Sequence, residues 1–252
     1  MNIQWDAEKY GSDFSFVQQY GGGAAELVDP VPGGTLLDLG CGNGALTALL
    51  RDRGFRVMGL EASPEQLALA RRSWPDIPFF QGDAADFSLP EPVDAVFSNA
   101  VFHWIDAARQ PDLLRCVHAA LKPGGQFVFE FGGAGNNRLI HGALAETFAR
   151  RGLPYRNPFY FPTVGEYAGR LEAAGFRVRL ALLFDRPTRL TGERGLEEWM
   201  DMFLKTPLSA FETEAERRAV LRETAEALRE ELFREGAWYA DYVRLRMKAI
   251  RL

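Results

Sequence analysis

Cysteine and histidine are scarce in this sequence of 252 residues, which contains two cysteines and three histidines. Cys41 and Cys116 match no metal-binding spacing and no disulfide framework, so we expect neither a metal site nor disulfide bonds. No apolar run approaches the roughly eighteen residues of a membrane-spanning helix. The first residues also lack the basic end and apolar stretch of a signal peptide. We therefore expect a cytoplasmic protein.

An excess of basic residues is also absent. The chain has 29 Lys and Arg against 34 Asp and Glu, a net charge of −5, which gives no support to nucleic-acid binding. With 47% hydrophobic and 25% charged residues, the composition is ordinary for a globular protein that contains one large α/β domain. We expect a small-molecule partner, and the sequence does not determine the oligomeric state.

One stretch, residues 35–47 (TLLDLGCGNGALT), organises the rest of the chain. Leu36, Leu37 and Leu39 form a short apolar run that predicts a strand buried on both faces. Three glycines at alternate positions follow, and residues 45–53 have helical spacing. A strand, a glycine turn and a helix are typical of a nucleotide-binding crossover. The third glycine comes one residue too early for the dinucleotide fingerprint, which argues against a dehydrogenase.

Asp38 lies two residues before the first of these glycines, Gly40. A carboxylate there would repel a diphosphate but suits a ligand with a positive amino group. S-adenosylmethionine has such a group, together with a sulfonium, and carries no phosphate. We expect Gly40 and Gly42 to let this ligand approach the main chain, and Cys41 to be a small residue that fits the turn.

Acidic residues follow the next two predicted strands. Glu61 ends the second strand, residues 56–60, and Asp83 follows the third, residues 77–81. Glu61 comes about 20 residues after Gly40, the distance at which an acidic residue reaches ribose hydroxyls in such a unit. We favour that contact over a carboxylate that merely lies at a helix N-terminus. Asp83 is either an acceptor for the adenine amine or a turn residue, and the other acids favour adenine.

The remaining elements alternate between strands and helices and then depart from that pattern. Strands are predicted at residues 93–99, 126–131, 176–184 and 242–250, and helices at residues 111–121, 138–151, 163–175, 196–204 and 213–233. Ser63 and Gln66 have the pattern of a capping box at the helix that follows the second strand. The last strand alternates apolar residues with Arg244, Arg246 and Lys248, which predicts one face in water. The aromatic-rich residues 5–20 either pack on the sheet edge or cover the ligand as a flap.

Five motifs together resemble those of the class I S-adenosylmethionine-dependent methyltransferases. They are residues 37–44 (LDLGCGNG), 59–63 (GLEAS), 82–84 (GDA), 94–99 (DAVFSN) and 121–125 (LKPGG), in family order and spacing. The resemblance implies an α/β fold, a Rossmann-like doubly wound sheet of seven strands. That sheet is mostly parallel, with the last strand antiparallel beside the sixth. We expect residues 1–184 to form the main domain, residues 185–237 a helical insertion and candidate substrate lid, and residues 238–252 the final sheet strand.

The same resemblance implies roles for single residues in binding S-adenosylmethionine. The methionine part is expected near Asp38, Gly40 and Asn99, and the ribose on Glu61. Adenine is expected beside Asp83 and Ala84, and the other implied cofactor contacts are Cys41, Gly42 and Ala62.

Residues 98–105 (SNAVFHWI) are similar to those of the trans-aconitate methyltransferase group, which esterifies small carboxylic acids. They are also similar to the methyltransferase that esterifies a malonyl carrier protein in biotin synthesis. We therefore expect a methyltransferase acting on a small molecule, with carboxyl O-methylation as one candidate reaction. Cyclopropane formation and natural-product methylation are alternatives. A non-catalytic S-adenosylmethionine-binding protein and an NAD-dependent dehydrogenase are alternatives from other classes.

Few residues are candidates for a catalytic base. A carboxylate acceptor is already ionised near pH 7, whereas a phenol, an amine or a carbon acid must lose a proton. His103, which follows the fourth strand, is the candidate catalytic residue, or else a cap or packing partner for Trp104. Trp104 and Trp199 are candidate substrate-binding residues, although aromatic residues at such positions are often part of the core.

Overall fold

A computed structural model of the protein describes residues 22–252. The predicted aromatic segment at residues 5–20 lies outside the described residues. By its internal contacts the chain forms two compact units. The first comprises the residues up to Ala134 together with Pro162–Leu183 and Arg244–Leu252, and the second comprises Gly135–Phe161 and Phe184–Val243.

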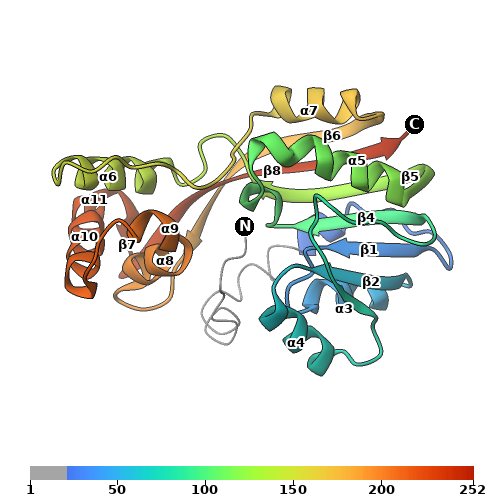
Figure 1. The fold of residues 1–252 in the computed structure, drawn as a ribbon, viewed down its shortest axis with the longest axis horizontal. Helices are drawn as coiled ribbons and strands as arrows, with labels where there is room; N and C mark the ends of the chain where they lie inside the picture. Colours follow the sequence, from blue (N-terminus) through green and yellow to red (C-terminus); the bar gives the residue numbers. More distant parts are fainter. Residues whose placement is uncertain (1–21) are drawn as a thin grey trace. The chain divides into compact units, whose positions relative to one another are not determined.

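The strands form a sheet with the order β3-β2-β1-β4-β5-β8-β6, which can be followed from β2 to β6 in Figure 1. The strands are β1 (Thr35–Leu39), β2 (Arg56–Glu61), β3 (Phe79–Gln81), β4 (Val93–Asn99), β5 (Leu121–Gly132), β6 (Phe176–Arg189) and β8 (Ala237–Arg251), and a short β7 (Phe233–Arg234) pairs with β8. Strands β1 to β5 pair in parallel, and β8 runs antiparallel to β5. The predicted Rossmann-like sheet, mostly parallel with an antiparallel last strand beside the sixth, is confirmed.

Helices connect these strands and build most of the second unit. They are α3 (Ala45–Asp52), α4 (Pro64–Ser73), α5 (Gln110–Ala120), α6 (Arg138–Ala149), α7 (Val164–Ala173), α8 (Gly195–Phe203), α9 (Lys205–Leu208), α10 (Glu214–Ala227) and α11 (Arg229–Leu232), with short 3-10 helices η1 (Phe102–Trp104) and η2 (Ala107–Arg109). In the described part of the chain, no helix combines the length and the apolar character needed to cross a membrane.

Strand β5 divides the core of the first unit into two layers, because its successive side chains point to opposite faces. Val128 packs on one face in a cluster with residues of β1, α3 and α4. Phe127, Phe129 and Phe131 lie on the other face, with ring centroids 4.5 and 5.9 Å apart along the strand. Tyr167 of α7 packs edge-on against this aromatic row, 5.0 Å from Phe131. At β5 both faces of the sheet are therefore closed to water, as the apolar run of this strand predicts.

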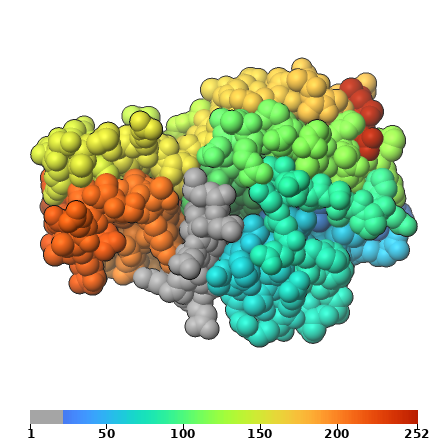
Figure 2. Space-filling model, viewed as in Figure 1, coloured from blue at the N-terminus to red at the C-terminus, as the bar shows by residue number. Residues whose placement is uncertain are grey.

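Strand β8 corrects one prediction about the last strand. Arg244 is buried, and Arg246 and Lys248 are half-buried, because β8 lies between β5 and β6 instead of beside an open edge. Arg246 pairs with the buried carboxylate of Glu130 at 2.7 Å, and Lys248 pairs with Asp29 at 2.6 Å. The predicted wet face is wrong, since Arg244 is buried and Arg246 and Lys248 pair with carboxylates of the same unit. At the end of the strand, red in Figure 2, the amide of Leu252 beside α7 donates to Gly175 at 3.0 Å.

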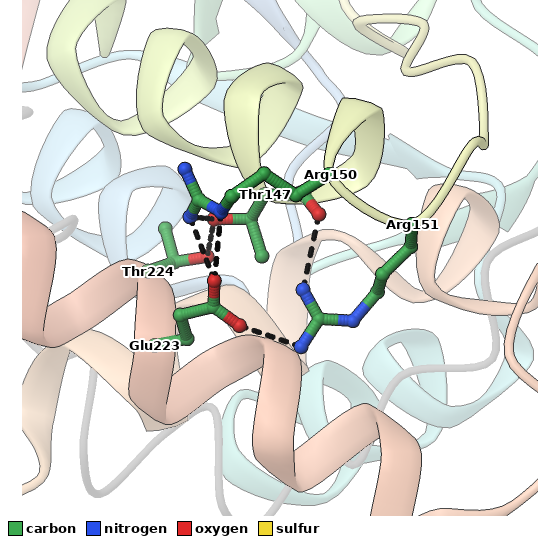
Figure 3. Close-up of polar contacts among 5 residues, drawn as sticks. All are labelled: Thr147, Arg150, Arg151, Glu223 and Thr224. Carbon is green, nitrogen blue, oxygen red and sulfur yellow. Dashed lines mark hydrogen bonds and ion pairs between the residues drawn. The ribbon is translucent and has the colours of Figure 1, made fainter.

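In the second unit, polar contacts join α6 and the residues after it to α10, as drawn in Figure 3. Glu223 pairs with Arg150 at 2.8 Å and with Arg151 at 2.6 Å. Beneath these exposed groups the hydroxyl groups of Thr147 and Thr224, both fully buried, are 3.3 Å apart. A surface ion pair alone contributes little, so the buried hydroxyl contact and the surrounding apolar packing carry most of the stability of this junction.

Several predicted boundaries in this region are wrong. The predicted helix at residues 213–233 is divided at Leu228 into α10 and α11, because Leu228 leaves the helical backbone conformation (φ −102°, ψ 6°). Strands β6 and β8 are longer than predicted. β6 continues through the polar residues 185–189, and β8 begins earlier, in the aromatic-rich residues 237–241.

Candidate active site

The glycine turn between β1 and α3 is bonded to the neighbouring strand. The backbone amides of Gly40 and Cys41 both donate to the carbonyl of Leu60 in β2, at 2.7 and 3.1 Å. Gly40 has φ 77°, and a Cβ atom there would lie 2.3 Å from the side chain of Val101. Gly44 has φ 81°, and a Cβ atom there would meet the ring of Phe79 at 2.7 Å. These two positions require glycine for both conformation and space.

Glu61 joins the glycine turn to the start of α4. Its Oε2 accepts from the amide of Gly42 at 3.0 Å, and its Oε1 accepts from the amide of Ser63 at 2.8 Å. Burial raises the pKa of Glu61, although these backbone bonds act in the opposite direction. Each carboxylate oxygen can accept a second hydrogen bond, so Glu61 holds the loop and can still accept from a ligand.

The same contacts correct the predicted capping box at Ser63 and Gln66. The Ser63 side chain accepts from the amide of Gln66 at 3.2 Å, as predicted. The reciprocal half is wrong, because the amide of Ser63 donates to Glu61 instead. The side chain of Gln66 lines the ligand cleft.

A cleft of about 680 Å³ opens at the carboxyl ends of the parallel strands, where ligands bind in open α/β sheets. Eight of the predicted site residues line it, namely Gly40, Gly42, Glu61, Ala62, Asp83, Ala84, Asn99 and Trp104. Residues that were not predicted as site residues also line it, among them Gln66, Gln81, Val101, Ile105, Asp106 and Arg109. Asp38, Cys41 and His103 do not line this cleft, although they belong to the same unit.

Asp38 lies beneath the glycine turn and is 2% exposed. Its Oδ2 accepts from the hydroxyl of Thr47 at 2.6 Å. Burial raises the pKa of Asp38 to about 7, the Thr47 bond opposes that shift, and the nearby charge of Glu61 adds to it. Burial, with the charges of Asp38 and Glu61, also raises the pKa of the Cys41 thiol, so this cysteine is protonated and unreactive near neutral pH.

Asp83 has two partners of its own. Its Oδ1 accepts from the amide of Ala85 at 2.9 Å, and its Oδ2 pairs with Arg109 at 2.9 Å. Although partial burial alone would raise the pKa of Asp83, these bonds lower it below its usual range, so the carboxylate is ionised. No sequence pattern indicates Arg109, because its contact with Asp83 depends on how η2 returns to the sheet edge.

Ala100 adds a strained turn to the cleft. Its φ is 62°, which is uncommon for a residue with a side chain, and its amide donates to the carbonyl of Glu130 at 2.7 Å. Such strain persists where the surroundings over-determine the conformation, often beside functional sites. Asn99 and Val101, on either side of Ala100, both line the cleft.

His103 is buried in η1, with its ring centroid 5.5 Å from that of Trp104. Its Nδ1 accepts from the amide of Gly132 at 3.3 Å. Burial, together with the charge of Arg244, lowers the pKa of His103 well below its usual value. The ring is therefore neutral, and because Nδ1 accepts a hydrogen bond, we assign its proton to Nε2.

Comparison with known proteins places this geometry in a family. The family model described as "Methyltransferase domain" matches residues 36–125, which contain the glycine turn, Glu61 and Asp83. An uncharacterized methyltransferase of Schizosaccharomyces pombe is 31% identical over 258 residues, covering 97% of both chains. The chain belongs to the class I S-adenosylmethionine-dependent methyltransferases.

A trans-aconitate 2-methyltransferase of Methylobacterium nodulans is similar to this methyltransferase, with 32% identity over 209 residues and 78% of each chain covered. Solved structures share its fold. A putative methyltransferase of Bacillus halodurans superposes with a TM-score of 0.65 at 16% identity, covering 92% of this chain and 99% of that one. An S-adenosylmethionine-dependent methyltransferase of Mesorhizobium loti superposes with a TM-score of 0.55 at 23% identity, covering 91% and 96%.

S-adenosylmethionine is the methyl donor of this enzyme, and the cleft fits it. The volume of about 680 Å³ lies in the range of small-molecule sites. A Cβ atom at Gly42 would meet nothing closer than 4.0 Å, so the main chain there is open to a ligand. Asp38 is buried and Glu61 is half-buried, and both have raised pKa values. A positively charged ligand would lower these pKa values and so favour the ionised state. The described residues contain no cluster of metal-ligating side chains.

Trp199 belongs to the second unit and is 2% exposed. Its indole Nε1 donates to the hydroxyl of Tyr242 at 2.6 Å, and its ring lies 5.2 Å from that of Phe203. These contacts are those of a core residue. The roles predicted for Trp199 as a pocket wall and for residues 185–237 as a lid stay predictions.

Proposed function

We propose that this methyltransferase esterifies a small carboxylic acid. The donor supplies a methyl group that is already activated on a sulfonium. The acceptor carboxylate forms the new C–O bond as the C–S bond breaks, the bonding electrons leave with sulfur, and no proton is transferred. The similarity to a trans-aconitate 2-methyltransferase over 78% of the chain supports this acceptor class.

The state of His103 is the observation that carries the proposal. Its Nδ1 is engaged by the amide of Gly132, and its proton lies on Nε2, so the ring has no basic nitrogen turned to a substrate. A phenol or amine acceptor would need such a base, whereas a carboxylate with an ordinary pKa near 4 is ionised at pH 7. In this reaction His103 fixes η1 and Trp104 at the end of the cleft.

The residues of the cleft then have distinct tasks in the proposed reaction. Glu61 accepts from the ribose hydroxyls while keeping its bonds to the glycine turn, and Asp83 with Ala84 borders the adenine. Gly40 and Asn99 hold the methionine part, and Asp38, buried beneath the glycine turn, supplies the negative charge that attracts its amino group. Trp104 and Ile105 exclude water from the reacting atoms, which must be held within about 3–3.5 Å of each other.

A chemical assay of the product tests this proposal. The protein is incubated with methyl-labelled S-adenosylmethionine and a panel of small di- and tricarboxylic acids, phenols, amines and unsaturated lipids. Each product is then treated with mild alkali. A methyl ester releases labelled methanol, whereas ethers, N-methyl groups and cyclopropanes keep the label. Label that stays with the product of the best acceptor would contradict the proposal.

A variant of His103 provides an independent control. His103→Gln should lower kcat by less than ten-fold and leave the pH dependence of kcat/KM between pH 6 and 9 unchanged. A general base contributes about 10²–10⁴-fold. A loss of that size in a folded variant, with a changed pH profile, would assign a proton-transfer role to His103 and favour a protic acceptor.

A further inference from the structure

Strand β6 (Phe176–Arg189) forms the last strand of the sheet among the described residues. It contains 14 residues, whereas β3 at the opposite end of the sheet contains three. An edge strand presents unpaired N–H and C=O groups that can pair with another chain, and proteins commonly keep such strands short or charged. The length of β6 therefore calls for an explanation that β3 does not need.

The middle of β6 is also apolar. Residues 180–184 (LALLF) are five consecutive apolar residues, and none of them is classed as buried. Leu182 is 46% exposed and Leu183 is 38% exposed. Apolar side chains on both faces are typical of a strand in the interior of a sheet, with a neighbouring strand on each side, and not of an exposed edge.

The sequence around Leu182 is self-complementary. If two β6 strands run antiparallel with Leu182 opposite Leu182 of the second copy, then Leu180 faces Phe184 and Ala181 faces Leu183. In the same register Arg179 faces Asp185 at both ends of the segment. Apolar and opposite-charge pairs directly across an antiparallel ladder are the stabilising pairs of a sheet. A one-residue shift of this register would lose both charge pairs.

We infer that β6 pairs with β6 of a second copy of this chain, which makes a two-fold dimer with a continuous sheet. Within the described residues neither Arg179 nor Asp185 makes an ion pair or a side-chain hydrogen bond, so both are available to the second copy. The two residues of each pair are both odd-numbered or both even-numbered. The backbone N–H and C=O groups of both residues therefore point to the same side of their strands, as an antiparallel ladder requires. Pro187 lacks an N–H group and ends the ladder beyond Asp185.

The dimer has a modest interface, because the contact is centred on seven residues from each strand. Interfaces at the small end of the size range are transient, with dissociation constants on the order of micromolar. A two-fold contact is self-complementary and closes on itself, so association should stop at the dimer and not continue to filaments.

Sedimentation velocity of the full chain over a range from about 1 to 100 μM tests the inference. The wild type should shift from monomer to dimer, and Leu182→Lys should remain monomeric because two lysines would face each other at the two-fold axis. Leu49→Lys is the matched control, since Leu49 is a leucine of α3 with 37% exposure, and its dimerisation should equal that of the wild type. Binding of S-adenosylhomocysteine confirms that each variant is folded.

Charge reversal tests the register itself. Arg179→Asp and Asp185→Arg each place like charges opposite one another at two symmetric positions, and each should weaken dimerisation by roughly ten-fold or more. The double variant Arg179→Asp with Asp185→Arg restores opposite charges and should recover the wild-type dissociation constant. A wild type that is monomeric at 100 μM, or a double variant as weak as the two single ones, would overturn the inference.

Discussion

Asp38→Asn is predicted to make the ligand-free protein more stable at pH 8. The reason is that Asp38 is buried, which raises its pKa from 3.8 to about 7. The folded state therefore binds this proton more tightly than the unfolded state does. The contribution of Asp38 to the stability of the wild type is fully present below about pH 4, and it is lost as the pH rises towards 7.

The magnitude follows from these two pKa values. Between pH 5 and pH 8 the ionisation of Asp38 should lower the free energy of unfolding by about 2–3 kcal/mol. The asparagine side chain has no charge to bury, and its oxygen can still accept from Thr47. The variant should therefore lack this part of the pH dependence, even if the exchange itself has a small pH-independent cost.

Urea unfolding of both proteins at pH 5 and pH 8, without ligand, measures the effect. Asp94→Asn in β4 is the control, because the pKa of Asp94 is shifted in the opposite direction. Bonds from Lys122 and Thr35 outweigh burial and lower the pKa of Asp94, so its contribution is lost only below about pH 4. That variant should lose the same stability at pH 5 and at pH 8. The change in unfolding free energy between pH 5 and pH 8 is compared in the two proteins. If that change were the same in Asp38→Asn and in the wild type to within 0.5 kcal/mol, roughly the scatter of surface substitutions, the burial argument would be refuted.

Three further predictions concern binding and stability. Glu61→Gln should weaken S-adenosylhomocysteine binding in calorimetry by roughly ten-fold or more, since each hydrogen bond to a charged group is worth about 1.5–3 kcal/mol, while Glu65→Gln in the same cleft should change it less than three-fold. Equal affinities would remove Glu61 from the site. Trp199→Ala should cost about 3–5 kcal/mol in denaturant unfolding, because the side chain is buried and its bond to Tyr242 is lost; a stable variant with altered acceptor kinetics would instead support a pocket role. Thr147→Val should cost about 1–3 kcal/mol, because it leaves a buried hydroxyl of α10 unsatisfied, and a neutral result in thermal unfolding would contradict that contact.

The sheet and the cofactor cleft could be predicted from sequence because both depend on residues that are close together in the chain. The apolar run from Leu36 to Leu39, the glycines that follow it and the acids at the strand ends each depend on a few neighbouring residues. Eight predicted residues accordingly line the cleft. The contacts of Glu61 with Gly42 and of Asp83 with Arg109 join separate segments, and no local pattern records how those segments approach each other.

The errors have the same physical origin. The cationic residues of β8 have the alternation of a solvent-exposed strand, and their partners Glu130 and Asp29 come from distant parts of the chain. The helical pattern is divided at Leu228, a residue type with high helix propensity, so no local pattern predicts this break. Trp199 is an aromatic residue of the kind that can line a pocket. Its hydrogen bond to Tyr242, which places it in the core, forms only in the folded unit.

The position of β8 between β5 and β6 has a consequence for biosynthesis. Ile250 pairs with Gln126, which the ribosome adds 124 residues earlier. Until residues 244–250 have left the ribosomal tunnel, β5 lacks its antiparallel neighbour and β6 has no strand to join. The nascent chain must therefore carry two open strand edges for the synthesis of more than fifty residues, which takes several seconds at about 5–20 residues per second. This methyltransferase should depend on chaperones during translation more than a protein whose strands pair in the order of their synthesis.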